Sequence, residues 1–138
     1  MGAQIVVNYT AVLVAAVVAF IIGGIWYGPL FGKLWMKLAF TSKKDMKKMG
    51  MGSAKKSMTI GFLVTVLTAY VLAYFVNYVQ ATTISGGIGL AFWLWLGIAG
   101  PVQIGSVLWE GKSWKLFWLT SAHEFVSLAV MASILAVW

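Results

Sequence analysis

The stretch VVNYTAVLVAAVVAFIIGGI, from Val6 to Ile25, contains no charged residue. A helix needs about 20 predominantly apolar residues to cross the hydrocarbon core of a bilayer. Gly28 and Pro29 follow this stretch, and proline ends a helix because it lacks a backbone N–H. A cleaved signal peptide would carry a basic segment before its apolar stretch, but no Lys or Arg precedes Lys33. The stretch therefore predicts a retained membrane-spanning helix over residues 6–25.

The same apolar character extends along the rest of the chain. Its 138 residues are 62% hydrophobic and 9% charged, whereas an average soluble domain is about 25% charged. Further apolar stretches predict three more spans, over residues 58–79, 87–109 and 115–138. We therefore expect an all-α fold, an integral membrane four-helix bundle that forms a single transmembrane domain over residues 1–138.

Residues 30–56 form the most polar part of the chain and hold eight of its ten lysines. In residues 30–40, Trp35 and Leu38 lie among Lys33 and Lys37. This spacing predicts a short amphipathic helix at the membrane interface, with its rings in the lipid and its amines in water. We expect the following residues, 41–57, to form a linker.

All ten lysines fall on one side of the predicted membrane. Lys112 and Lys115 flank the turn between the third and fourth spans, on the same side as the basic loop 30–56. Because Lys and Arg favour the cytoplasmic side, we expect a multi-pass protein of the bacterial inner membrane, with its N-terminus and C-terminus outside. The basic loop suits anionic lipid head groups, although solvated lysines that obey the topology rule explain it equally well. We expect no nucleic-acid partner, because no basic-aromatic module is present.

Two ionisable side chains interrupt the fourth span near its middle. His123 and Glu124 lie close to mid-membrane when residues are counted from the start of that span at about 1.5 Å each. The short turn before the span predicts an antiparallel hairpin in which Gln103 faces His123. Ser106 is expected to face Thr120 in the same hairpin. The predicted polar intramembrane layer consists of His123, Glu124, Gln103, Ser106, Thr120, Ser127 and Thr65.

This layer has two interpretations. In the first, Gln103, Ser106, Thr120 and His123 hydrogen-bond to one another and hold the helices together, each bond contributing about 0.6 kcal/mol, and Glu124 is protonated or hydrogen-bonded. In the second, His123 and Glu124 mark a path for protons or small cations, or a polar ligand site, since a charge at mid-membrane costs at least about 2.5 kcal/mol. Adjacent residues on a helix point about 100° apart, so we expect these two not to line the same face.

Small residues recur at four-residue spacing along the first and third spans, which lets another helix approach closely. Either packing within the bundle or self-association of copies explains them. The proline in the third span removes a backbone hydrogen bond, and a kink is favoured there over an ion-coordinating break. The predicted helix-packing residues are Ala11, Ala15, Ala19, Gly23, Gly97, Pro101 and Gly105, with Ala132 and Ala136 on the fourth span.

Motifs of known enzyme classes are missing from the sequence. The chain has no cysteine, which excludes thiol nucleophiles and thiolate metal sites. Its single histidine has no partner at the H-E-x-x-H spacing, and the glycines at 86–89 open a span instead of following a strand. We therefore expect no enzyme activity, no catalytic residue, no metal and no cofactor.

Two aromatic segments are similar to those of a known family. The first is WYGPLFGK, residues 26–33, followed by Trp35 and Met36. The second is VLWEGK, residues 107–112, followed by WKLF, residues 114–117. They resemble the bacterial membrane family catalogued as Domain of Unknown Function 1761, over nearly the whole chain apart from the lysine-rich linker. The resemblance supports the topology and implies no activity.

The first of these segments surrounds the exit of the first span. It predicts a rigid anchor that fixes the amphipathic helix at the membrane surface, or alternatively a cytoplasmic mouth beside a conduit. The residues of this interfacial anchor are Trp26, Tyr27, Pro29, Phe31 and Trp35.

Two functions follow from these patterns. One is a small homo-oligomeric channel or transporter for protons, ions or a small solute, with His123, Glu124 and Gln103 near the path. The other is a non-catalytic accessory or structural subunit, which docks on a larger membrane complex or on its own copies through small-residue helix faces.

Overall fold

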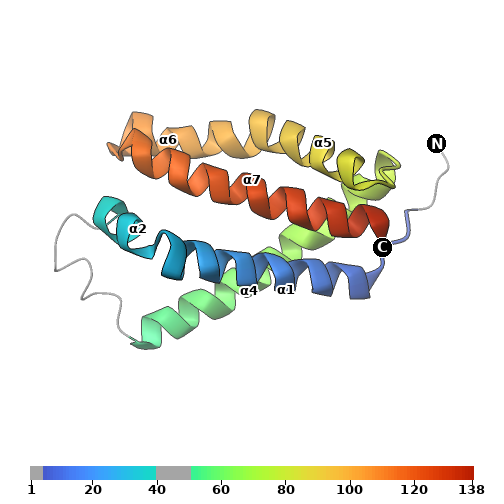
Figure 1. Ribbon diagram of the computed structural model, residues 1–138, viewed down its shortest axis with the longest axis horizontal. Coiled ribbons are helices and arrows are strands. Elements are labelled where there is room, and N and C mark those ends of the chain that lie inside the picture. The colour runs from blue at the N-terminus through green and yellow to red at the C-terminus, as the bar shows by residue number, and fades with distance from the viewer. Residues whose placement is uncertain (1–4, 40–50) are drawn as a thin grey trace.

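A computed structural model describes residues 5–39 and 51–138, with the backbone alone for residues 51–54. The described chain is all-α (Figure 1), as predicted. Lysines 43, 44, 47 and 48 of the predicted basic loop lie outside the described residues. The elements, in chain order, are α1 (Tyr9–Ile25), η1 (Trp26–Leu30), α2 (Gly32–Ala39), α4 (Met51–Tyr78), α5 (Ile84–Leu94), η2 (Trp95–Ala99), α6 (Gly100–Glu110) and α7 (Trp114–Val137).

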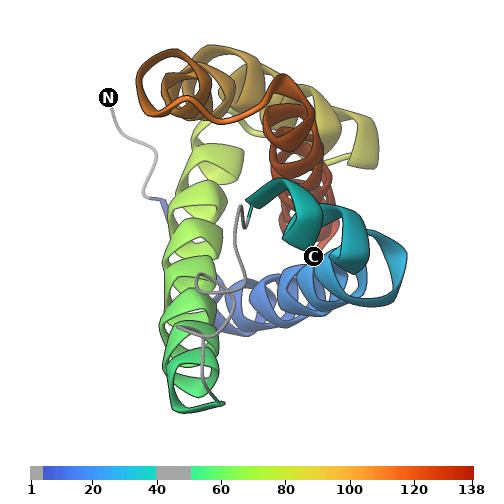
Figure 2. The same cartoon turned by 90° about the vertical axis from the view of Figure 1, so that its left-hand side faces the viewer.

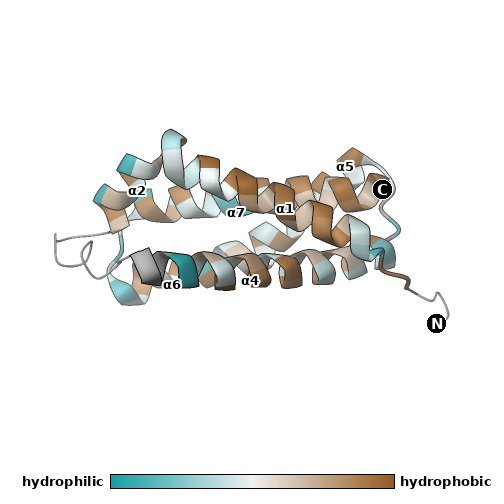
Figure 3. Cartoon of the chain, turned by 90° about the horizontal axis from the view of Figure 1, so that it is seen from below, coloured by the Kyte–Doolittle hydropathy of each residue, from teal (hydrophilic) through white to brown (hydrophobic). Residues whose placement is uncertain are grey.

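Four helical stretches are long and apolar enough to cross a membrane. They are Tyr9–Leu30, Lys55–Tyr78, Ile84–Glu110 and Trp114–Val137. Large apolar side chains such as Leu13, Leu67 and Ile98 are exposed on their outer surfaces. Apolar residues dominate the middle of the helices (Figure 3), and a surface of this kind needs lipid as its solvent. The chain is therefore a membrane protein.

Helix α7 lies at the centre of the arrangement. It contacts α1, α2, α4, α5, α6 and η2, and Figure 2 shows α1, α4 and the α5–α6 pair around it. Its buried residues Leu128, Met131 and Ala132 belong to the hydrophobic core. Helix α7 therefore contacts each of the other three spans, and α1 and α4 also pack on each other.

The closest helix contact is between α5 and α7. A Cβ atom on Gly87 would lie 2.7 Å from the backbone oxygen of Ala132, so only glycine fits there. Further along the same pair, the Trp95 indole N–H donates to the hydroxyl of Ser121 at 2.8 Å and to its backbone oxygen at 2.9 Å. Ser121 is completely buried. Small residues and one hydrogen-bonded tryptophan thus fix these two helices together.

The connections between spans are closed by local hydrogen bonds. Asn8, Thr83 and Ser113 each accept a backbone N–H at the start of α1, α5 and α7. Gly111 ends α6 with φ +70°, a left-handed conformation that glycine adopts without strain. The Lys112 N–H then donates to the Ser106 carbonyl at 3.1 Å. These caps make the α6–α7 turn short, so the two helices run antiparallel as the sequence indicated.

Both prolines lie at irregular helical segments. Residues Trp26–Leu30 and Trp95–Ala99 form π-helical turns, η1 and η2. Within η1, Gly28 has non-helical angles (φ −108°, ψ −106°), so the chain bends at the predicted helix end, although the helical stretch continues to Leu30. In the third span, the turn before Pro101 is widened: the Gly100 N–H donates to the Trp95 carbonyl, five residues back. The irregularity expected at this proline is therefore a π-helical turn.

Helix α4 begins earlier than the sequence suggested. The expected start was residue 58, after a linker over residues 41–57, but the helix begins at Met51. The sequence estimate used hydropathy, which marks where a helix enters lipid and not where its hydrogen bonds begin. Lysine is a good helix former, and exposed Lys55 and Lys56 continue the helix beyond the apolar residues.

The small residues that recur at four-residue spacing, here called the small-residue ridges, have different environments on the first, third and fourth spans. Ala11, Ala15 and Ala19 are buried inside the chain, where α1 packs on α4 and α7. On the third span, Gly97 and Pro101 are exposed. Gly105 is half-buried, and a Cβ there would meet only the Trp109 ring at 3.9 Å. On α7, Ala132 is fully buried and Ala136 is half-buried. The ridge of the first span therefore serves packing within one chain, and the ridge of the third span faces outward.

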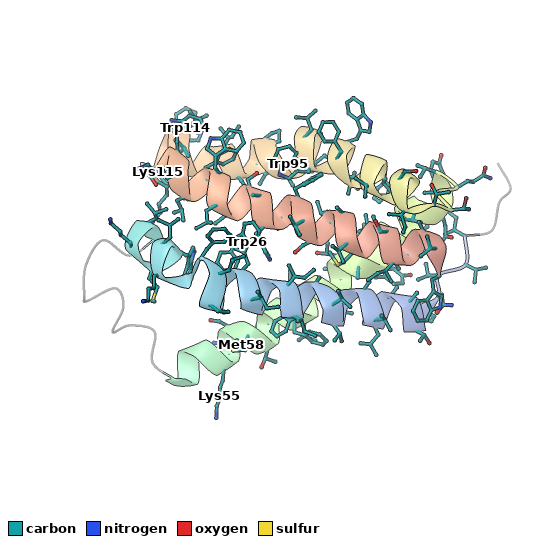
Figure 4. All side chains as sticks on the ribbon, in the orientation of Figure 1. Trp26, Lys55, Met58, Trp95, Trp114 and Lys115 are labelled. Carbon is teal, nitrogen blue, oxygen red and sulfur yellow. The ribbon has the colours of Figure 1, made fainter. Side chains whose placement is uncertain are left out.

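The described lysines gather at one end of the bundle. They belong to α2, the start of α4, the α6–α7 turn and the start of α7, which lie together at the left of Figure 1. The start of α1 and the end of α7 lie at the opposite end. Trp114 and Lys115 share the lysine-bearing end with Lys55 (Figure 4), so an aromatic residue accompanies the charges there.

Gly87→Ala should destabilise the protein by about 1–3 kcal/mol, because the new methyl group forces α5 away from the α7 backbone. Gly89→Ala is the matched control, since a Cβ on Gly89 meets nothing within 4 Å. Thermal unfolding in detergent, followed by circular dichroism, measures both. Equal stability of the two variants would contradict the close contact.

Candidate functional site

Polar side chains from two spans meet at a cavity between α1, α4 and α7, which we call the α1–α4–α7 cavity. It has a volume of about 400 Å³. Thr65 enters it from α4, and His123, Glu124 and Ser127 enter it from α7. The structure thus brings together four of the seven residues of the predicted polar layer. The remaining wall is formed by Ala19, Phe20, Gly23, Gly24, Tyr27, Met58, Gly61, Val64, Thr68 and Met131.

His123 is held on the α1 side of this cavity. Its Nε2 atom lies 3.3 Å from the hydroxyl of Ser127, one helical turn further along α7. A Cβ atom on Gly23 would lie 3.3 Å from the same nitrogen. The absence of a side chain on Gly23 therefore leaves the room in which the imidazole lies. Gly23, which was predicted as a helix-packing residue, therefore also forms part of the site.

Two aromatic rings of η1 enclose the imidazole. The ring centroids of Tyr27 and His123 are 4.9 Å apart, and those of Trp26 and His123 are 5.8 Å apart. Phe31 packs on Trp26 at 4.8 Å, and Trp35 packs on Tyr27 at 5.5 Å. Figure 4 shows Trp26 between α1 and α7. These contacts connect α2 to the middle of α7.

The predicted interfacial anchor is therefore also a wall of the site. Pro29 is exposed at the bend, and the other four anchor residues are half-buried. Trp26 and Tyr27 contact the one histidine of the chain directly. The Trp26 Nε1 atom is buried and has no hydrogen-bond partner among the described residues. Sequence reasoning treated this segment and His123 as separate features, because they lie about a hundred positions apart in the chain.

Glu124 lies on the α4 side and also borders a second cavity, which we call the α4–α5–α7 cavity. This cavity has a volume of about 370 Å³ and lies between α4, α5, η2 and α7. Thr68 and Glu124 line both cavities. The carboxylate of Glu124 forms no hydrogen bond and no ion pair with the residues that the structure describes. Both cavities thus share one carboxylate, which lies close enough to Tyr27 for an electrostatic interaction but accepts no hydrogen bond from the described residues.

His123 and Glu124 were expected not to line the same face. They do lie against different neighbours, His123 against α1 and Glu124 against α4 and α5. Both nevertheless line the α1–α4–α7 cavity. The cavity is wide enough to be lined by two side chains that point about 100° apart on α7. The expectation from helical periodicity did not take the width of the cavity into account.

The rest of the predicted layer lies elsewhere. Gln103, Ser106 and Thr120 line a groove of about 520 Å³ between α6 and α7. Ser106 and Thr120 donate their hydroxyls to backbone carbonyls of their own helices. The expected pairing of Gln103 with His123 is wrong, because His123 lies against α1. Counting from the turn gives depth in the membrane but not direction around α7.

Gln103 has an unusual environment for an amide. Its Oε1 atom is buried and has no hydrogen-bond partner among residues 5–39 and 51–138. Ser106 donates to the backbone carbonyl of Gln103 and not to its side chain. The side-chain hydrogen bond that joins the third span to α7 is instead formed by Trp95 and Ser121. The sequence analysis missed this pair, although a tryptophan and a serine inside neighbouring spans are the types that satisfy each other when buried.

The chemistry available at the site is limited by its ligand atoms. Within the described residues, no group of three or more His, Cys, Asp or Glu side chains could hold a metal ion. Thr65 and Thr68 donate their hydroxyls to the carbonyls of Gly61 and Val64 on their own helix, at 2.8 and 3.0 Å. Their oxygens remain acceptors toward the cavity. The site therefore offers one carboxylate, one imidazole and several hydroxyl oxygens within a largely apolar wall.

Gly23→Ala should displace the His123 imidazole by a few tenths of an ångström, because the new methyl group contacts Nε2. Gly24→Ala is the matched control, since a Cβ at Gly24 meets nothing within 4 Å. The chain has a single histidine, so the imidazole ¹⁵N resonances of the labelled protein report on this residue alone. We expect a shift in the first variant only, and unshifted resonances in both would contradict the contact.

The chain matches a family model over residues 10–136, which include all of the site residues described above. The family is described as a protein of unknown function (DUF1761). No curated protein and no solved structure matches the chain. The match confirms the resemblance carried by the two aromatic segments. The chain belongs to the DUF1761 family.

Proposed function

We propose that this membrane protein is a small channel or transporter, in which Glu124 and His123 bind a proton, a cation or a small solute on its way across the bilayer. The observation that carries the proposal is the environment of Glu124. It lies ten residues after Trp114 along α7, about 15 Å into the span. It lines two cavities and has no hydrogen-bond partner among the described residues.

The energetics favour a function over a purely structural role for this residue. A charged side chain at the centre of a bilayer costs at least about 2.5 kcal/mol on insertion scales. A structural carboxylate offsets such a cost with hydrogen bonds from neighbouring helices, and the described neighbours of Glu124 supply none. His123 does not compensate for it, because its Nε2 faces Ser127 and Gly23. A passing cation or proton would provide the missing partner.

The distribution of the lysines supports a proposal for the orientation of the protein in the membrane. The lysine-bearing end, with α2 and the α6–α7 turn, is proposed to face the cytoplasm of a bacterial inner membrane, where Lys is favoured. Both termini would then lie outside. Lys33 and Lys37 on α2 are exposed, in a position to meet anionic lipid head groups. The α1–α4–α7 cavity would lie between this basic surface and the middle of the membrane.

Glu124→Gln should reduce cation flux to the level of protein-free vesicles, because it removes the charge and keeps the shape of the side chain. Purified protein in liposomes, with a pH-sensitive or cation-sensitive dye inside and a potassium diffusion potential across the membrane, gives the measurement. Glu110→Gln is the matched control: it makes the same charge change at the end of α6, outside both cavities. Equal flux through wild type and Glu124→Gln would contradict the proposal.

A second candidate function is supported by the outer face of the third span. Gly97 is exposed, and a Cβ there would meet nothing within 4 Å. Pro101, four residues further along the same span, is exposed as well. Small residues on an exposed helix face suit a close contact with another transmembrane helix. Such a contact would make the chain a self-associating protein or a subunit of a larger membrane complex.

Gly97→Leu should weaken self-association, because the larger side chain prevents close helix approach. Sedimentation equilibrium in detergent measures the effect, and an increase of the dissociation constant by about tenfold corresponds to about 1.4 kcal/mol. Gly24→Leu is the control, since Gly24 is exposed on α1 and equally free of neighbours. A monomeric wild type, or equal association of both variants, would contradict a homo-oligomer built on this face.

A further inference from the structure

The two cavities that meet at Glu124 have the composition of a ligand pocket for a largely apolar molecule. Volumes of about 400 Å³ and 370 Å³ fall in the range of small-molecule sites, about 300–1,000 Å³. Apolar side chains such as Phe20, Met131 and Phe75 form most of the walls. A pocket of this kind binds the body of a ligand by apolar contact and orients it by a few polar groups.

The charge of the pocket has one sign. Glu124 is the only Asp, Glu, Lys or Arg among the described residues that line the two cavities. The described lysines belong to α2, the start of α4 and the α6–α7 turn, and none of them lines either cavity. A single carboxylate in a low-dielectric wall attracts a monovalent cation more strongly than in water. An anionic ligand would meet uncompensated repulsion there.

The ligand atoms favour an organic cation over an inorganic one. Metal cations such as Ca²⁺ take about six to eight oxygen ligands, several of them carboxylates or carbonyls, whereas the site offers one carboxylate, one imidazole and the hydroxyls of Thr65, Thr68, Ser127 and Tyr27. An organic cation needs no such shell, since its charge is spread over an apolar body. The rings of Tyr27 and Phe20 in the same wall suit it further, because a cation is attracted to the face of an aromatic ring.

We infer that the α1–α4–α7 cavity binds a lipophilic organic monocation, with Glu124 as its charge partner and the ring of Tyr27 against its apolar body. This inference rests on the proposed function, for which it names the substrate class. Because Thr68 and Glu124 also border the α4–α5–α7 cavity, a cation held by Glu124 contacts both cavities. The same carboxylate is therefore reached from α1 on one side and from α5 on the other.

Binding of tetraphenylphosphonium to the purified full-length protein, measured by isothermal titration calorimetry in detergent, tests the inference. We expect saturable binding to wild type and a dissociation constant at least about tenfold higher for Glu124→Gln, equivalent to about 1.4 kcal/mol. Glu110→Gln should bind as wild type does. Tetraphenylborate, an anion of the same shape, should not bind saturably to wild type.

A second variant tests the cavity without changing its charge. Gly61→Leu places a side chain into the α1–α4–α7 cavity, because Gly61 lines it and a Cβ there meets nothing within 4 Å. We expect it to weaken binding by about tenfold or more. Gly89→Leu is its control, since Gly89 is equally free of neighbours and lines neither cavity. Circular dichroism and gel filtration verify that each variant is folded.

The outcomes separate this inference from the function on which it rests. Binding lost in Glu124→Gln and Gly61→Leu but kept in their controls supports the organic-cation site. Absence of saturable binding to wild type, or equal binding by wild type and both cavity variants, overturns it. Glu124-dependent proton flux without tetraphenylphosphonium binding overturns the substrate class and leaves the transport function standing. Glu124-dependent binding without any flux keeps the site and removes transport.

Discussion

In a bilayer, apolar side chains gain little by leaving lipid for protein, so helices associate where their surfaces fit closely or share hydrogen bonds. In this chain the close fit is concentrated on α7. Gly87 of α5 lies against the Ala132 backbone, and Gly23 of α1 lies against the His123 ring. Trp95 adds a hydrogen bond to Ser121, two residues before His123 along α7. The positions of α1 and α5 both depend on these few close contacts with α7.

Helix α4 completes the bundle in a different way. Ala69, Leu72 and Ala73 of its C-terminal half are buried in the core, whereas Ile60, Leu63 and Val64 of its N-terminal half are exposed. Figure 1 shows this half diverging from α7 toward the lysine-bearing end. Both cavities that contain Glu124 lie along α4. The carboxylate is therefore placed where the packing around α7 is least complete, which is where a ligand has room.

The sequence predicted the parts of this structure that depend on depth along the membrane. Hydropathy located the four apolar helices, because it uses only distance along a helix. Direction around a helix was not predictable in the same way. Gln103 was expected opposite His123. The two residues lie on different sides of α7, because His123 contacts α1 and Gln103 lines the groove between α6 and α7. The contact of Trp26 with His123 was also missed, because it joins segments whose order around α7 no local pattern encodes.

The two π-helical turns connect these observations. π-helical turns are rare, and they recur at functional sites. Here η1 places Trp26 and Tyr27 against His123, and η2 places Trp95 on Ser121. Both turns therefore direct an aromatic side chain to the same short stretch of α7, next to Glu124. A chain that needed only to fill the membrane could have used regular helices at both positions. Both irregular turns therefore fix the segment of α7 that carries Glu124, whose carboxylate accepts no hydrogen bond from the described residues, and a segment held in this way suits the proposed role of Glu124.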